Sequence, residues 1–250
     1  MTRRDLLKTS AASAAAALLS PASQGSARAG EAGGKPNVVF VFADQWRAQA
    51  TGYAGDPNVR TPHLDALSRE SLNFANAVAG CPVCSPYRAS LVTGQYPLTH
   101  GVFVNDVCLG RAATSLADAF SQAGYRTACI GKWHLDGHGR SNYIPPERQQ
   151  GFDYWKVLEC THAYDRSAYY AGNSDHKLYW EGYDALAQTR DAIDYIRRQE
   201  GDRPFLLVLS WGPPHDPYGT APEEFRSLYR PEDIQLRPNV PEHRAEQARR

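Results

Sequence analysis

The stretch PNVVFVFADQ, residues 36–45, decides the fold expected for this chain. Its central residues, Val38 to Ala43, form a continuous apolar run of the kind found in strands that are buried on both faces. The run ends in two polar side chains, Asp44 and Gln45. In open α/β sheets, ligands bind beyond the carboxyl ends of the strands. The segment therefore predicts a strand that carries polar groups to a binding site.

Two later strands are expected to end in the same way. Arg126 to Ile130 reads as a strand followed by Lys132 and His134, and Phe205 to Trp211 reads as a strand that runs into His215. Helical patterns alternate with these strands and are expected near residues 61–74, 84–94, 115–123 and 183–199. Such alternation predicts a mostly parallel sheet with helices on both faces. The polar side chains at the strand ends are therefore expected to converge.

Residues 84–88, Cys-Ser-Pro-Tyr-Arg, open one of these helices. Pro86 fits the first turn without losing a hydrogen bond, so Cys84 is expected at the helix N-terminus, where the dipole favours an anion. Arg88, four residues later, lies on the same face. A reactive side chain, the positive end of the helix dipole and the Arg88 guanidinium are therefore expected at one point, where an oxyanion can bind.

Cysteine spacing leaves other interpretations open. Cys81 and Cys84 form a CxxC motif, which also suits a redox pair, half of a zinc site or a structural disulfide. The remaining cysteines are Cys108, Cys129 and Cys160. Their pairing cannot be deduced from sequence, although Cys129, inside an apolar strand, is most simply a small core residue.

The wider segment CPVCSPYRASLVTGQYP, residues 81–97, resembles the signature of the type I sulfatases. In that family a CxPxR cysteine is oxidised by a maturation enzyme to Cα-formylglycine. Only Cys84 fits the pattern, because Ser85 stands four residues after Cys81. Four more segments resemble the family in its order: PNVVFVFADQ, TPHLDALSRES, GKWHL and PPHDP. The resemblance covers nearly all of residues 36–218 and implies the three-layer α/β/α fold of the alkaline phosphatase-like superfamily.

By this resemblance the protein is a sulfuric ester hydrolase that acts on a sulfated small molecule or carbohydrate. In the family, formylglycine is hydrated to a geminal diol; one hydroxyl attacks sulfur, and loss of the other hydroxyl's proton releases sulfate. Cys84 would supply this nucleophile and Arg88 would hold it. Lys132 would contact the sulfate, and His134 would orient or deprotonate the diol. His215 would contact the sulfate or protonate the leaving group.

The resemblance also implies a divalent cation held by Asp44, Gln45 and the residue formed from Cys84. Calcium is favoured because it prefers oxygen donors. Many relatives have two acids where this chain has Asp44 and Gln45, so its site carries one negative charge less. Taken alone, an Asp at a strand end is often a cap or turn former. His100, Asn105 and Asp106, which follow the signature helix, fit a turn equally well and are not assigned to the site.

Composition and the N-terminus indicate where the protein works. A chain of 250 residues with 42% hydrophobic residues and a formal charge of +0 reads as globular and soluble, with no nucleic-acid partner. Residues 1–29 resemble a twin-arginine export signal with an AxA cleavage site, and the apolar run is too short for a stable membrane span. We expect a periplasmic or secreted protein, exported in the folded state by the twin-arginine machinery after the formylglycine-generating enzyme has acted.

The rest of the chain divides into three expected parts. Residues 30–35 read as a linker, 36–218 as the N-terminal part of a sulfatase catalytic domain, and 219–250 as a loop or tail. The family's later metal ligands and second sulfate-binding lysine have no counterpart in this sequence. The chain is therefore expected to lack half of the metal shell and to leave an internal strand as an exposed edge.

Two alternatives from other functional classes remain open. Related formylglycine enzymes hydrolyse phosphonate or phosphate monoesters, and relative rates on matched aryl sulfate and aryl phosphonate separate that activity from a sulfatase. The second alternative is an inactive pseudoenzyme or binding module. Peptide mass spectrometry identifies it, because a pseudoenzyme needs no aldehyde at Cys84.

We predict that the 250-residue chain, purified and modified, is weakly active or inactive by itself on an aryl sulfate. The physical reason is that a cation with oxygen ligands takes six or more donors, and few are expected here. A steady-state assay measures this directly, and robust turnover would refute the prediction.

Overall fold

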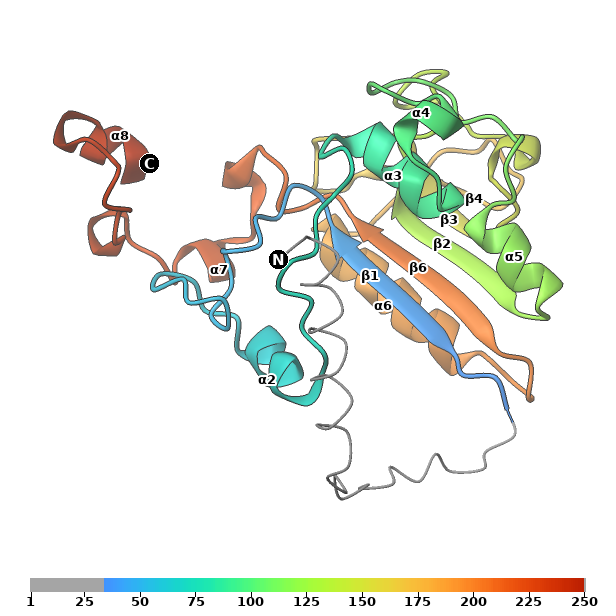
Figure 1. Cartoon of the computed structure of the whole chain (residues 1–250), viewed down its shortest axis with the longest axis horizontal. Coiled ribbons are helices and arrows are strands. Elements are labelled where there is room, and N and C mark those ends of the chain that lie inside the picture. Colours follow the sequence, from blue (N-terminus) through green and yellow to red (C-terminus); the bar gives the residue numbers. More distant parts are fainter. Residues whose placement is uncertain (1–33, 250) are drawn as a thin grey trace, which may run out of the picture. The chain divides into compact units, whose positions relative to one another are not determined.

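The computed structural model describes residues 34–249, and in that part of the chain six strands form one sheet (Figure 1). The strands are β1 (Val38–Ala43), β2 (Arg126–Lys132), β3 (Tyr154–Leu158), β4 (Ala168–Ala171), β5 (Leu178–Tyr179) and β6 (Phe205–Trp211). Their order is β1-β6-β2-β3-β4-β5. The first four strands in this order are parallel, and β4 and β5 add antiparallel pairs at one side.

Helices connect and cover the strands. The α-helices are α2 (Pro62–Glu70), α3 (Cys84–Thr93), α4 (Pro97–His100), α5 (Leu116–Gln122), α6 (Asp184–Arg197), α7 (Glu223–Arg226) and α8 (Ala245–Arg249). Short 3-10 turns lie at Pro146–Arg148, Tyr218–Thr220, Pro231–Asp233 and Glu242–Arg244. None of the helices within residues 34–249 has the length and apolar character needed to cross a bilayer.

Two hydrophobic clusters lie on opposite faces of the sheet, as the alternation of side chains along a strand requires. Cys129 and Val208 belong to the cluster that contains buried residues of α3 and α5. Ile130 and Leu207, their neighbours in sequence, belong to the cluster that contains buried residues of α6. Figure 1 shows α3 and α5 on one side of the sheet and α6 on the other. The expected three-layer α/β/α architecture with a mostly parallel sheet is confirmed.

Strand β1 is an edge strand among the described residues, because β6 is its only partner in the sheet. Val39 and Val41 lie opposite Leu207 and Leu209, on the face that α6 covers, yet they are 48% and 44% exposed. The reason is that α6 packs mainly on β6 and β2. The expectation that Val38–Ala43 is buried on both faces is therefore wrong.

The region 140–180 is rich in tyrosine and tryptophan and adds strands to the sheet. It contains β3, which pairs in parallel with β2, and the antiparallel strands β4 and β5. Four of its large aromatic side chains are buried: Trp155, Tyr164, Tyr170 and Trp180. Trp155 belongs to the cluster that contains residues of α3 and α5, and Trp180 belongs to the cluster that contains residues of α6.

Two further segments differ in detail from the sequence reading. Helix α2 ends at Glu70 rather than near Phe74, and Leu72 and Phe74 are exposed beyond it. The region from residue 219 onward contains short helices, and part of it is held to an earlier loop through paired hydrogen bonds between Asn58 and Gln235. The expected signal at residues 1–29 and most of the expected linker at 30–35 lie outside the described residues.

Gly131 is a backbone constraint close to the strand ends that form the site. It has φ +107°, and a Cβ there would lie 2.1 Å from the backbone oxygen of Ser210 on the neighbouring strand β6. Gly172 also has positive φ, +54°, but a Cβ there would meet nothing within 4 Å. A side chain at Gly131 would therefore bring both a steric clash and backbone strain, whereas a side chain at Gly172 would bring backbone strain alone.

We predict that Gly131→Ala lowers the free energy of unfolding by about 3 kcal/mol or more, since strain and a backbone clash combine. Gly172→Ala should cost about 1 kcal/mol, because it introduces strain alone. Urea denaturation of both variants measures the difference. Equal losses would contradict the assignment of a clash at Gly131.

Candidate functional site

The centre of the site is the carboxylate of Asp44, which directly follows β1. Its Oδ2 atom forms ion pairs with Arg88 Nη2 at 2.9 Å and with Lys132 Nζ at 2.7 Å. All three side chains are buried. Burial alone would raise the pKa of Asp44, but the two neighbouring cations outweigh it and lower the pKa to about 2. Asp44 is therefore ionised, and the three groups together carry one net positive charge.

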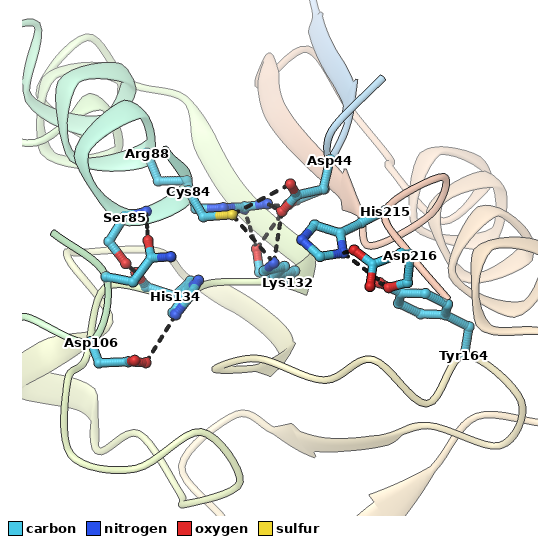
Figure 2. A network of polar contacts seen from close by, with 12 residues as sticks. Asp44, Cys84, Ser85, Arg88, Asp106, Lys132, His134, Tyr164, His215 and Asp216 are labelled. Atoms are coloured by element: carbon cyan, nitrogen blue, oxygen red, sulfur yellow. Dashed lines mark hydrogen bonds and ion pairs between the residues drawn. The ribbon is translucent and has the colours of Figure 1, made fainter. Parts of the chain in front are cut away.

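Cys84 is the first residue of α3, preceded by Val83 at the N-cap position, and it faces this charge cluster (Figure 2). Its Sγ atom lies 3.5 Å from Asp44 Oδ1 and 3.8 Å from Lys132 Nζ. The thiol is free and half-buried. Burial, together with Asp44, raises the pKa of the Cys84 thiol, although Lys132 and Arg88 oppose that shift. The unmodified cysteine is thus held mainly as a thiol.

Arg88 connects α3 to two strand ends. Besides Asp44, its guanidinium donates to Lys132 O at 2.8 Å and to Ser210 Oγ at 2.7 Å. It also lies 5.1 Å from the centroid of the Phe42 ring. A side chain with partners on β1, β2 and β6 holds the N-terminus of α3 over the carboxyl ends of those strands.

His134, just beyond β2, is buried with 2% of its surface exposed and has φ +59°, in the left-handed region. Its Nε2 atom lies 3.0 Å from Asp106 Oδ1, and Arg140 binds the same carboxylate through Nε at 2.9 Å and Nη2 at 2.7 Å. Its Nδ1 atom is buried without a hydrogen-bond partner and points toward Cys84 in Figure 2. Burial lowers the pKa of His134 to about 4 despite the Asp106 carboxylate, so the ring is neutral at pH 7.

His215 approaches the cluster from the loop after β6. One ligand atom of each of Asp44, Cys84 and His215 lies within 4.8 Å of the others. The His215 ring stacks on the ring of His162, with 4.6 Å between centroids and an interplanar angle of 14°. Its Nδ1 lies 3.0 Å from Asp216 Oδ1, and Tyr164 donates to the Asp216 carbonyl at 3.2 Å (Figure 2).

A cavity of about 530 Å³ opens over the cluster. Its lining includes Asp44, Gln45, Cys84, Asn105 and His215. A larger cavity of about 780 Å³ shares Gln45 and Trp46 with it and is lined by further aromatic side chains, namely Trp211, Tyr218 and Tyr229. All the residues expected at the site therefore lie together, with Gln45 on the exposed side and Lys132 and His134 beneath.

The oxygen donors at Asp44 and Gln45 fit a hard divalent cation in kind but not in number. Asp44 Oδ2 is already bound by Arg88 and Lys132, which leaves Asp44 Oδ1, and Gln45 lines the same cavity with an amide that contains a further oxygen donor. Such a cation takes six or more oxygens. Within residues 34–249, the side chains at this point supply only part of that shell.

Sequence reasoning missed several residues that support the site. Asn105 Oδ1 accepts a hydrogen bond from the Ser85 backbone N–H at 2.9 Å, which caps the start of α3. Asp106 fixes the ring of His134, and His162 stacks on His215. Asn105 and Asp106 were visible as polar residues after the signature helix, but loops carry no periodicity that would assign them. His162 had no distinguishing signal.

Comparisons with known proteins identify relatives of this chain. A family model described as Sulfatase matches residues 36–242. An ulvan-active sulfatase of Formosa agariphila is 53% identical over 207 residues, which are 82% of this chain and 40% of that protein. A structure solved in complex with its substrate, D-glucosamine-2-N,6-O-disulfate, aligns with TM-score 0.64 and 28% identity over 72% of this chain and 35% of that one.

A more distant structure supports the fold alone. The phosphonate monoester hydrolase of Agrobacterium radiobacter aligns with TM-score 0.60 and 23% identity over 81% of this chain and 45% of that one. The three-layer α/β/α fold is shared with these solved structures. The chain belongs to the sulfatase family, whose model matches residues 36–242. It spans about 40% of the length of its ulvan-active relative.

The export signal expected at the N-terminus is also found. Residues 1–20 match the model of the twin-arginine translocation pathway signal sequence. The chain therefore carries a signal for export to the periplasm or beyond.

We predict that protonation of His134 destabilises the protein as pH falls. The folded-state pKa of about 4 lies below the ordinary value of 6.5, so the stabilising neutral form is fully present above pH 6.5 and lost between pH 6.5 and 4. The contribution is on the order of 3 kcal/mol. Asp184, whose pKa burial raises to about 6, has the opposite slope in part of this window.

The measurement is therefore a comparison of the wild type with His134→Asn, which tolerates positive φ and keeps Asp184. Denaturant unfolding at several pH values should show wild-type stability decreasing more steeply toward pH 4 than that of the variant. Parallel curves for the two proteins would mean that His134 does not titrate as described.

Proposed function

We propose that the protein hydrolyses sulfate esters, with Cys84 as the residue converted to the Cα-formylglycine nucleophile. The observation that carries this proposal is the position of Cys84 at the start of α3, half-buried, free and 3.8 Å from Lys132 Nζ. When present, the hydrated aldehyde supplies an oxygen nucleophile that can expel sulfate by elimination. A plain cysteine lacks that route.

The cations around Asp44 are suited to an anionic substrate. Arg88 and Lys132 carry two positive charges and Asp44 carries one negative charge, so the cluster has a net charge of +1. Residue 84 lies in the wall of the 530 Å³ cavity. Preorganised cations in a partly dry site stabilise negative charge that develops in a transition state. We assign Arg88 the role of holding the side chain of residue 84, and Lys132 the role of binding the sulfate group of the substrate.

The two histidines take different proton roles in this proposal. His134 is neutral because burial lowers its pKa, and its Nδ1 has no other partner, so it can accept a proton from a group on residue 84. Asp106 holds the ring in place through Nε2. His215 lies at the cavity wall beside Asp216, where it can contact the sulfate or donate a proton to the leaving oxygen.

Asp44 and Gln45 are the residues that we assign to a divalent cation, with calcium the best match to oxygen donors. An oxygen on residue 84 would be a third ligand. Bound there, the cation would supply positive charge to polarise the sulfate ester. Gln45 is suited to this role because it is exposed, follows Asp44 directly and lines the same cavity.

A sulfated carbohydrate is the substrate class that we favour. The relative from Formosa agariphila is named for activity on ulvan, and a similar structure holds a disulfated glucosamine. In this chain, the aromatic side chains of the adjoining 780 Å³ cavity offer flat surfaces on which a sugar ring can pack. Maturation by a formylglycine-generating enzyme before export belongs to the same proposal.

The test of this proposal is expression together with a formylglycine-generating enzyme, followed by peptide mass spectrometry and assays. We predict conversion of Cys84 to the aldehyde, and a preference for an aryl sulfate over a matched aryl phosphonate. Where the wild type turns over, Cys84→Ala should lower kcat more than about a thousandfold. Cys81→Ala is the matched control and should remain modified and active. An unmodified Cys84 in folded protein from such cells would overturn the proposal.

A further inference from the structure

A second group of metal-ligating side chains lies outside the residues used above. Cys108, Asp136 and His138 each offer one ligand atom, and these atoms lie within 4.8 Å of one another. The Cys108 thiol is free and half-buried, and the Asp136 carboxylate is fully buried. The side chain of His138 is 54% exposed. The group is therefore enclosed on the side of Asp136 and open to solvent beside His138.

The backbone that carries these three side chains is held in place. Leu109 N donates to Leu135 O at 2.8 Å, which joins the two loops. Gly137, with φ +68°, allows them to approach so closely that a Cβ there would lie 2.5 Å from Cys108 N. The buried Glu159 carboxylate accepts backbone N–H groups of Leu135, Asp136 and Gly137 at 3.1, 2.8 and 2.9 Å.

The side chains themselves are oriented in the way that metal ligands usually are. Arg148 donates to both oxygens of Asp136, at 2.5 and 3.3 Å, and fixes the carboxylate plane. His138 Nδ1 lies 2.6 Å from the backbone oxygen of Asp136 and 3.4 Å from its Oδ2 atom. A carbonyl oxygen only accepts a hydrogen bond, so Nδ1 is the donor in that contact. Carboxylates and ring nitrogens supported in this manner are typical around bound metals.

The local charges favour a divalent cation. Asp136 and Glu159 carry two negative charges and Arg148 carries one positive charge. A thiolate at Cys108 would bring the group to a net charge of −2, which one divalent cation neutralises. Binding would release the thiol proton to solvent.

We propose that Cys108, Asp136 and His138 form a binding site for a thiophilic divalent cation, with zinc as the best match. Sulfur, nitrogen and carboxylate oxygen donors together suit zinc, whereas calcium takes oxygen ligands. Three protein ligands leave the fourth tetrahedral position to water on the exposed side. The bound cation would clamp two loops that carry Asp106 and His134, each two residues away from a ligand.

The test uses the full chain with Cys84→Ser as background, so that the thiol of the candidate active site cannot bind the probe. The metal-free protein is titrated with cobalt(II), followed by competition with zinc. We expect one equivalent to bind with a thiolate-to-cobalt charge-transfer absorption and with visible bands typical of four-coordination. No such absorption would overturn the proposal.

Two variants in the same background identify the ligands. Cys108→Ser should abolish the charge-transfer absorption, and His138→Asn should weaken zinc binding by more than about tenfold. His176→Asn, at another exposed histidine, is the matched control and should bind as the background does. His138 is exposed, so its substitution leaves the core intact, and circular dichroism checks the folding of both variants. Unchanged affinity in either variant would contradict the site.

Discussion

The ion pairs that Asp44 makes with Arg88 and Lys132 are the constraint on which the rest of the structure depends. They join the ends of β1 and β2 to the first turn of α3, three elements that lie far apart in sequence. Removing one member of a buried pair leaves an uncompensated charge, at a cost of about 3 to 5 kcal/mol. The same two cations create the positive surroundings of Cys84. The charges that join these elements are therefore the same ones that we propose for binding the anionic substrate.

The fold could be predicted where apolar runs and helix signals were strong. Strand β6 has the bounds expected from its sequence, and Gly94 ends α3 in the left-handed conformation that only glycine adopts easily. Burial could not be predicted equally well. The continuous apolar run of β1 indicates two buried faces, but α6 packs over the neighbouring strands β6 and β2. The position of a helix over a sheet is set by tertiary packing, which the pattern of one strand does not show. Strand β3 was not among the strands expected from the sequence, although it pairs in parallel with β2.

The candidate site could be predicted as far as it depends on parallel strands. Asp44 and His215 follow two such strands and Lys132 is the last residue of a third, so their proximity is a property of the topology. The residues that orient them come from loops, where spacing says nothing about direction. Asp106 is one example: it reads as a turn residue, and only the folded chain brings it to Nε2 of His134. Sequence thus indicated which groups meet, but not which nitrogen of each ring is free to react.

Gln45, Asp106 and His134, three residues of the candidate site, share a backbone property. All three have positive φ, at 53°, 63° and 59°, a region that residues other than glycine occupy at some energetic cost. Glycine would relieve that cost at each position but would remove the side chain that the proposed site uses. A more thermostable version of this protein that keeps these three groups must therefore gain its stability at other positions.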